Sequence, residues 1–520
     1  MKNSEPTNKS DSQQAKNNTD VFVAREADWR IGAVVYQVIV DRFAPSQYLE
    51  NKLNLYPSPK QLNEWQQDPI HGQYLEDEKL WSHEIQFWGG DLASVTNKVE
   101  YLHCLGIDVL YLNPIHLAYT NHKYDALDYQ QVSPEYGTRA DVKTLADELH
   151  SKGMKLVLDG VFNHMGQNAD IFKQALHNTD SEYRHWFSFS EEYEHGYLAW
   201  EQAANLPELN LENEHVREHV YGAPNSVVQS YLNNEGIDGW RLDVAFDIGP
   251  KYLSELTEAA QIAKSDALVV CEIWNYPNDW FPAIDAIMNF SLREIILRTV
   301  QGDASVNVAR QMLLTLFDTA HYEHLLKSWI VLDNHDTPRL KTLLADNWQQ
   351  QMAQVLQFTL PGAPNIYYGV EAGMKGGHDP EMRGPMQWQN AQPGNIEFDW
   401  LQQLITMRRQ LRALRVGDFR LVIADQLLAF ERFTDQVQDT TIVVINPTNN
   451  QLTESIMLTN SMLMQGSKVS DLLGTLAEPI EIFSGFLRLT VPAQSSVVLT
   501  LIEQPAFHYS PYKRVINPAS

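Results

Sequence analysis

The stretch GWRLDVA, residues 239–245, guides the interpretation of the whole chain. In a β-strand, side chains two positions apart share a face, so Arg241 and Asp243 should point to one side and Leu242 to the other. An arginine at that distance favours the ionised form of an aspartate, and an ionised aspartate at a strand end can act as a nucleophile. Taken alone, an Arg-x-Asp pair is more often a structural ion pair, so its meaning depends on what accompanies it.

Three other apolar runs end in polar residues in the same way. They are KLVLDGVFNH (155–164), LVVCEIW (268–274) and WIVLDNHDTPR (329–339). Strands buried on both faces of a parallel sheet read as continuous apolar runs, and catalytic groups of a (β/α)8 barrel lie at the C-terminal ends of several strands. The sequence therefore predicts a barrel in which four strand ends converge on one site.

In this order, DGVFNH, GWRLDVA, CEIW and DNHD resemble segments of the α-amylase family, glycoside hydrolase family 13. The segment LPELN (206–210) is similar to the MPKLN form of the neopullulanase and cyclomaltodextrinase group. Other stretches agree with that group, and the resemblance spans about Trp29 to Trp400: YQVIVDRF (36–43), FWGGDL (87–92), HKYDALDY (122–129) and NIYYGVEAGMKGGHDP (365–380). It implies a barrel with a small domain inserted after strand 3.

The chemistry implied is cleavage of a glycosidic bond by two carboxyl groups, which stand ~5–5.5 Å apart in retaining enzymes. Asp243, beside Arg241, is the better nucleophile. Glu272 is expected near Asp243 and Asp336 and has no arginine near it in sequence. Its pKa should therefore be raised, as a general acid requires. By resemblance, Asp336 would stabilise the transition state.

The resemblance also implies a set of supporting roles. His164 and His335 would bind hydroxyls of the sugar being cleaved, and Tyr124 would be a stacking platform. Arg241 and Arg339 complete the expected substrate-binding set. Two further residues are expected to be structural and near the site: Asp159, which would orient Arg241, and Asn163.

Composition excludes several classes of partner. The net charge of −27 argues against binding to nucleic acid or an anionic membrane surface, because Lys and Arg supply those affinities. No apolar run approaches the ~20 residues of a membrane span. We expect no cofactor and no metal requirement, although some relatives hold a structural calcium ion. In those relatives a histidine follows the nucleophile by four residues, whereas this chain has Asp247 there.

The expected domain organisation has a large barrel interrupted twice. An aromatic-rich insertion should wall the barrel mouth, and a period-two pattern after the barrel predicts an antiparallel β-sandwich. The expected segments are a disordered tail (1–28), the first part of the barrel (29–164) with its insertion (44–87), an inserted small domain (165–235), the second part of the barrel (236–416), the sandwich (417–505) and a second tail (506–520).

Some properties stay open at the level of the sequence. Relatives of the neopullulanase type usually carry a β-domain before the barrel, whereas about twenty-eight residues precede Trp29 here, so the oligomeric state is unknown. A cytoplasmic location is expected if Met1 is the native start, and a periplasmic or secreted one if the chain is trimmed. Both Cys104 and Cys271 are interpreted as buried thiols.

The expected function is retaining hydrolysis of α-1,4-glucosidic bonds in short malto-oligosaccharides, cyclodextrins or pullulan. By resemblance, Val244 is also compatible with α-1,6 bonds. One alternative is a transferase of the same fold, which differs only in whether water reaches the acceptor side. A second is an inactive carbohydrate-binding relative, which the presence of all three carboxyl residues disfavours.

Overall fold

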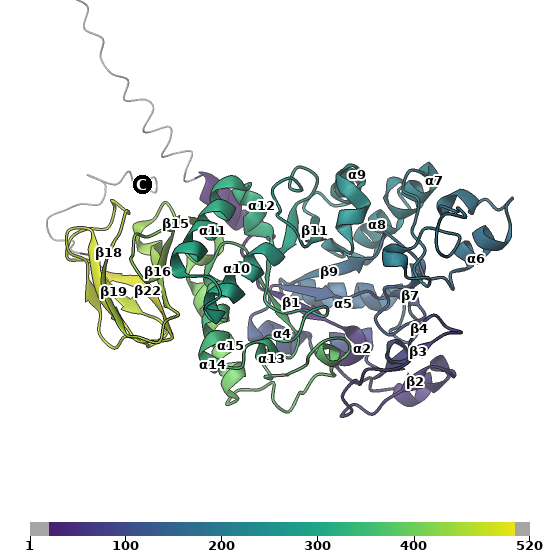
Figure 1. The fold of residues 1–520 in the computed structure, drawn as a ribbon, viewed down its shortest axis with the longest axis horizontal. Helices are drawn as coiled ribbons and strands as arrows, with labels where there is room; N and C mark the ends of the chain where they lie inside the picture. The colour runs from purple at the N-terminus through teal and green to yellow at the C-terminus, as the bar shows by residue number, and fades with distance from the viewer. Residues whose placement is uncertain (1–19, 505–520) are drawn as a thin grey trace, which may run out of the picture.

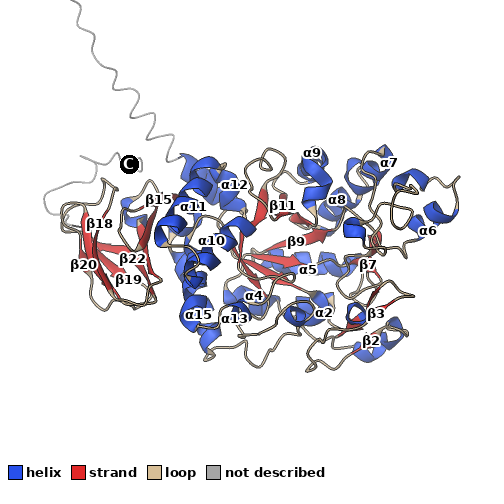
Figure 2. Cartoon of the chain, in the orientation of Figure 1, coloured by secondary structure: helices blue, strands red, loops and turns tan. Residues whose placement is uncertain are grey.

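The computed structural model describes residues 20–504, and a closed parallel barrel of eight strands lies at its centre (Figures 1 and 2). This confirms the predicted (β/α)8 barrel. Each strand is short and buried. In chain order the strands are β1 (Val35–Val38), β6 (Val109–Leu112), β9 (Lys155–Gly160), β10 (Gly239–Leu242), β11 (Leu268–Ile273), β12 (Ala286–Asn289), β13 (Trp329–Val331) and β14 (Ala363–Tyr367).

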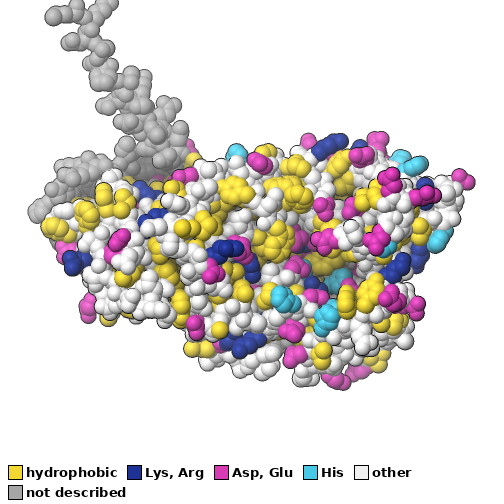
Figure 3. All heavy atoms as spheres, in the orientation of Figure 1, with side chains coloured by type: hydrophobic (Ala, Val, Ile, Leu, Met, Phe, Trp, Pro, Cys, Tyr) yellow, Lys and Arg dark blue, Asp and Glu magenta, His cyan; other side chains and the backbone are white. Residues whose placement is uncertain are grey.

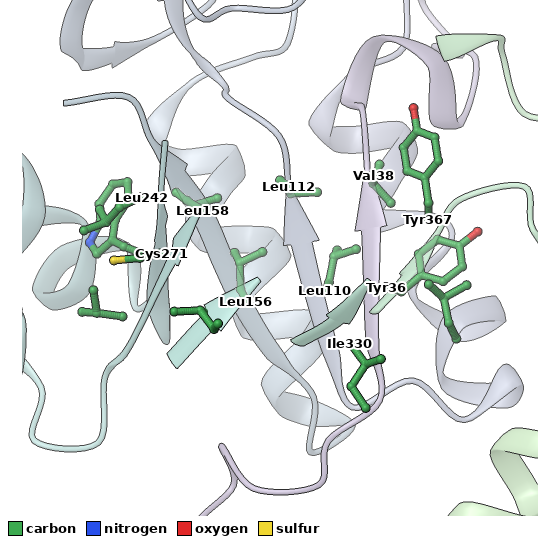
Figure 4. Packing of buried hydrophobic residues seen from close by; sticks show 14 of the residues in the cluster. Tyr36, Val38, Leu110, Leu112, Leu156, Leu158, Leu242, Cys271, Ile330 and Tyr367 are labelled. Carbon is green, nitrogen blue, oxygen red and sulfur yellow. The ribbon is translucent and has the colours of Figure 1, made fainter. Parts of the chain in front are cut away.

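Side chains along these strands alternate between two cores. Leu156, Leu158 and Leu242 point outward and pack under the helices, as Figure 4 shows. Val157 and Val270 point inward and fill the barrel together with residues of the other strands. Because the alternation continues to the strand ends, the next inward positions after these valines are occupied by acidic residues, Asp159 and Glu272.

The helices surround the barrel, with apolar faces turned toward it. Asp91 caps the first of them, since its side chain accepts a hydrogen bond from the backbone N–H of Ser94 at 2.7 Å. The single helix predicted from Leu92 is broken into two pieces, α3 and α4. The longer helices are α5 (Arg139–Ser151), α9 (Ala245–Ala263), α10 (Phe290–Gln301), α11 (Val306–Thr319), α14 (Asn347–Thr359) and α15 (Ile396–Gln410), and the two pieces are α3 (Leu92–Thr96) and α4 (Val99–Leu105).

The two cysteines differ in exposure. Cys271 is buried on β11 as predicted, but Cys104 is exposed, because α4 turns Val99, Leu102 and Leu105 inward and leaves Cys104 on its outer side. No helix within residues 20–504 is both long enough and apolar enough to cross a membrane.

Two long excursions leave the barrel. The first, after β1, carries two small two-stranded sheets, β2 (Gln61–Leu62) with β5 (Gln86–Phe87) and β3 (Tyr74–Leu75) with β4 (Leu80–Trp81). The second follows β9 and includes α6 (Asp170–His177) and α7 (Glu214–Arg217). Its LPELN segment returns to the barrel, where Glu208 forms a β-bridge with His164. Both excursions lie at the same end of the barrel in Figure 1.

The C-terminal region forms a separate antiparallel β domain with its own core. A six-stranded sheet faces the pair β18–β21, as predicted for a sandwich. A continuous strand from Leu421 to Phe430 was expected, but a turn divides this region between β15 and β16. The strands are β15 (Asp418–Leu421), β16 (Leu428–Phe433), β17 (Thr441–Asn446), β18 (Leu452–Met457), β19 (Lys468–Asp471), β20 (Ile480–Glu481), β21 (Phe486–Val491) and β22 (Ser495–Glu503).

The first residues that the structure describes differ from the sequence expectation. Residues 20–27, assigned to a disordered tail, form a helix in which Phe22 and Arg25 are buried. Arg25 pairs with Glu323 at 2.7 Å and with Asp418 at 2.8 Å, which joins this helix to the barrel and to the C-terminal sheet. The rest of that tail, residues 1–19, and the predicted tail at 506–520 lie outside the described residues.

Candidate active site

A pocket of about 390 Å³ opens at the C-terminal ends of the barrel strands. Its lining combines acidic groups, histidines and aromatic rings, the composition expected of a site that binds a neutral sugar and performs acid–base chemistry on it. The lining residues are Glu84, His122, Tyr124, His164, Trp200, Leu206, Asp243, Val244, Glu272, Trp274, Asp336, Asp379 and Arg383.

Arg241 holds the carboxyl groups at the floor of this pocket. Its Nη1 lies 2.9 Å from Asp159 and 3.0 Å from Asp243, and its Nη2 lies 2.9 Å from Glu272. The register explains the first contact, because Arg241 of β10 pairs directly with Asp159 of β9. Glu272 has no arginine near it in sequence, but β11 lies next to β10, and the fold brings Arg241 into contact with it.

Burial dominates the titration of this cluster. It raises the pKa of Asp243 well above its usual range, against the opposing effect of Arg241 and with the support of Glu272 and Asp159. It also raises the pKa of Asp159 to about 6. The net lowering expected at Asp243 is thus outweighed. Asp159 and Asp243 are both buried and share one guanidinium, so this pair of carboxyls is inclined to keep a proton.

The backbone beyond Asp243 adopts a conformation that is uncommon for its residue type. Val244 has φ 47° and ψ 41°, the left-handed region, which is costly for a β-branched side chain. Its N–H points to Glu272 Oε2 at 3.3 Å, and α9 begins at the next residue. This turn directs the Asp243 side chain into the pocket at the junction of strand and helix.

Asp336 is held from a different side. Its carboxyl lies 3.1 Å from His335 Nε2 and 3.4 Å from Arg383 Nη2. Arg383 also pairs with Asp379 at 2.9 Å, and the other oxygen of Asp379 lies 2.9 Å from His83 Nε2. Burial raises the pKa of Asp336, while Arg383 and Arg241 oppose that rise.

Tyr124 lines the pocket, and His335 lies buried against the Tyr124 ring without lining the pocket itself. The two rings are stacked, with centroids 5.4 Å apart and planes that are parallel to within 6°. Tyr124 Oη contacts both His335 Nε2 and Asp159. Gln37 Nε2 donates to His335 Nδ1 at 2.9 Å, which leaves the imidazole proton on Nε2. Burial lowers the pKa of His335 well below its usual range, so the ring is neutral, and its Nε2–H faces Tyr124 Oη.

His164 also lines the pocket. Its ring stacks on Trp200 at 5.5 Å and 23°, and Nε2 contacts the backbone carbonyl of Tyr124 at 3.1 Å. Burial lowers its pKa to about 4. Asn163 precedes it and is buried behind the wall, where its carbonyl accepts from the Leu209 N–H at 2.9 Å. This placement agrees with a structural position beside the site.

Three of the residues predicted to bind substrate do not line the pocket: Arg241, His335 and Arg339. Arg339 is engaged by the backbone. It is buried, and its guanidinium donates to the backbone carbonyls of Tyr368 at 2.7 Å and Met382 at 3.0 Å. Its substrate-binding assignment is therefore corrected to a structural one. Arg383 is the arginine that reaches the pocket, and it lies close after the matched stretch that ends at Pro380.

The sequence analysis also missed groups that the excursions contribute. The insertion supplies Glu84 to the pocket, and the inserted domain supplies Trp200 and Leu206. The expectation that the excursions wall the site is thus met by different residues. The insertion was predicted from its aromatic residues, but five of these do not line the pocket: Tyr48, Tyr56, Trp65, Tyr74 and Trp81.

No group of three or more His, Cys, Asp or Glu side chains in the described part of the chain is arranged to hold a metal ion. Asp247, at the position where some relatives have a histidine ligand, is exposed. We therefore predict that dialysis against EDTA leaves the hydrolytic rate unchanged, measured as reducing sugar released from maltotriose. A loss of activity that added calcium restores would contradict this prediction.

Comparison with known proteins agrees with the geometry. Residues 37–416 match the family described as "Alpha amylase, catalytic domain". The chain therefore belongs to the α-amylase family, which confirms the predicted barrel and the glycoside hydrolase class.

Three individual relatives show the degree of similarity within the family. The chain is 32% identical to a cyclomaltodextrinase of Geobacillus thermopakistaniensis (strain MAS1), over 84% of this chain and 71% of that protein. It is 32% identical to neopullulanase 2 of Thermoactinomyces vulgaris, over 82% and 71% respectively. The solved cyclic α-maltosyl-(1→6)-maltose hydrolase of Arthrobacter globiformis superposes with a TM-score of 0.75 at 26% identity, covering 91% of this chain and 99% of that one.

Proposed function

We propose that this protein hydrolyses α-1,4-glucosidic bonds in short malto-oligosaccharides, cyclodextrins or pullulan, with retention of the α configuration, and that it also accepts α-1,6 bonds. The bridge that Arg241 makes between Asp243 and Glu272 carries the proposal. A guanidinium that contacts both carboxyls holds them close together, which favours the short spacing of retaining enzymes over the wider spacing that an inverting enzyme needs for its water.

In this mechanism Asp243 attacks the anomeric carbon and Glu272 gives its proton to the leaving oxygen. Asp159 is ruled out of either role because it lies below the pocket, fully engaged by Arg241, Tyr111 and Tyr124. Water then enters, Glu272 removes its proton, and the bond between the sugar and Asp243 breaks with both carboxyls restored.

The other pocket residues would position the sugar. Asp336, ordered by Arg383, can accept from sugar hydroxyls and stabilise the positive charge of the transition state, while His335 holds the Tyr124 ring in place through its Nε2. Tyr124 and Trp200 both line the pocket, and their aromatic rings suit the apolar faces of a glucose ring.

A product profile on maltotriose, β-cyclodextrin, pullulan and starch tests the proposal, with the anomeric configuration of the first product read by NMR. We expect α-configured glucose, maltose or panose as early products. Longer oligosaccharides accumulating at high sugar concentration would favour the transferase of the same fold. An early β signal, or no turnover of any of these substrates, would contradict the proposal.

We further predict a preference for small substrates. Glu84, Trp200 and Leu206 wall the pocket, so each extra glucose of a long chain must be ordered and desolvated against a wall. Short linear or cyclic malto-oligosaccharides should show kcat/KM higher than soluble starch by ~10-fold or more, about 1.4 kcal/mol in transition-state binding. Initial-rate kinetics check this, and an equal kcat/KM on starch with a wide ladder of internal products would contradict it.

A cytoplasmic location is part of the proposal. Its support is the 30% identity to the intracellular maltogenic amylase of Bacillus subtilis (strain 168), over 76% of this chain. Fractionation of cells that express the natural gene tests it, and recovery of the protein in the medium or the periplasm would contradict it.

A further inference from the structure

A second cavity, of about 570 Å³, adjoins the active site and shares one wall with it. That wall is Trp274, which lines both cavities and is 54% exposed. The second cavity lies between the loop after β11 and the helices α10 and α11, and Figure 3 shows hydrophobic side chains on the surface over these two helices. We call it the side cavity; its volume falls within the ~300–1,000 Å³ of small-molecule sites.

Trp274 ties the side cavity to the leaving-group side of the reaction. Its indole Nε1 donates to Glu272 Oε1 at 3.0 Å, and one face of its ring stacks on Phe290 with centroids 3.7 Å apart. Under the proposed function, Glu272 is the carboxyl that protonates the leaving oxygen. A group attached to that oxygen therefore passes next to Trp274 as it leaves the pocket, and it can extend from there into the side cavity.

The lining of the side cavity suits an apolar group better than another sugar. Its wall includes the aliphatic side chains of Ile295, Val308, Met312 and Leu316, of which Val308 is 48% exposed. A sugar placed there would have several hydroxyls facing this wall without hydrogen-bond partners, and unpaired polar groups are costly to desolvate.

Several polar side chains of the same lining already form hydrogen bonds or ion pairs within the protein. Tyr276 Oη donates to the Thr315 carbonyl at 3.2 Å. Glu294 pairs with Arg293 at 3.1 Å and with Arg298 at 3.3 Å. These groups have less capacity left for a polar ligand, whereas apolar surface is left uncovered.

We propose that the side cavity binds the apolar aglycone of an α-glucoside or α-maltoside, an alkyl or aryl group attached to the oxygen that Glu272 protonates. This inference rests on the proposed function for the orientation of the substrate. Cleavage of such a compound releases the apolar alcohol and leaves the sugar on Asp243, from which water removes it; each proton passes through Glu272.

The test compares the binding of n-octyl α-maltoside, below its micelle-forming concentration, with that of methyl α-maltoside. The full chain carrying Asp243→Asn is used, so that binding is measured by calorimetry without turnover. We expect the octyl compound to bind ~10-fold or more tightly, because each buried methylene adds to the apolar area removed from water. Equal affinities of the two compounds would overturn the proposal.

Variants on α11 locate the binding. In the same background, Val308→Asp should reduce the octyl preference to less than about threefold, since it places a charge on the apolar wall, while Val308→Leu should keep the preference. Position 308 is in the first turn of α11, where an acidic residue is compatible with the helix. Leu314→Asp is the matched control, because Leu314 is 45% exposed on the same helix but does not line the cavity. An octyl preference lost equally in Val308→Asp and Leu314→Asp, or retained in Val308→Asp, would overturn the assignment.

Failure of the proposed function and failure of the aglycone site would give different results. The unsubstituted chain is assayed in parallel on maltotriose, and the absence of hydrolysis there would contradict the proposed function without changing the ratio of the two affinities. Hydrolysis of maltotriose together with equal binding of the two maltosides would contradict only the aglycone site.

Discussion

Asp243→Asn and Glu272→Gln are each expected to lower kcat on maltotriose by ~1,000-fold or more, because carboxyls that act as a unit lose most of their effect when either is removed. The two variants should differ on α-maltosyl fluoride, whose leaving group needs no proton. The Glu272 variant should still form the glycosyl-enzyme, seen as a mass increase of the intact protein, and the Asp243 variant should not.

Asp247→Asn is the matched control for this pair. Asp247 is an exposed acidic residue that follows Asp243 by four positions and does not line the pocket, so its loss should leave kcat unchanged. Melting temperatures of all three variants would show that the chain still folds. If both catalytic variants trapped the glycosyl-enzyme equally well, the two roles would be reversed or mistaken.

Arg241→Lys is expected to lower kcat/KM by ~100-fold or more, although it preserves the charge. The guanidinium reaches Asp159, Asp243 and Glu272 at once, and an ammonium group is a single point that cannot reproduce this fork. A shift of about 1 Å in a reacting group can cost a factor of that order.

The same substitution should change the pH dependence in a defined direction. Arg241 opposes the rise in the pKa of Asp243, so weakening its contact lets that pKa rise further. The nucleophile is then ionised only at higher pH, and the acidic limb of the profile of kcat/KM against pH moves upward.

Arg339→Lys is the control for this experiment. Arg339 is equally buried but donates to backbone carbonyls, so its replacement should lower the melting temperature without moving the acidic limb. An unmoved limb in Arg241→Lys, or the same shift in both variants, would show that Arg241 does not act through the carboxyl cluster.

The sequence by itself determined which residues face inward at the strand ends. A strand has a side-chain period of two, so Val157 inside the barrel requires Asp159 inside it, and Arg241 requires Asp243. Short apolar runs that stop in polar residues were enough to predict the barrel, and the family segments were enough to predict three carboxyl residues of the pocket, Asp243, Glu272 and Asp336. Local patterns of this kind survive folding because they depend on neighbours along the chain.

Only the tertiary structure decided which of these groups touch. Because β10 and β11 are adjacent, Glu272 contacts the arginine that the sequence paired only with Asp243 and Asp159. Burial rather than Arg241 then dominates the pKa of Asp243. The tertiary structure also places Arg383, not Arg339, at the pocket, because Arg339 donates to backbone carbonyls. It brings Glu84 and Trp200 into the pocket wall. Loop conformation and burial depend on contacts between distant segments, and no local pattern in the sequence records them.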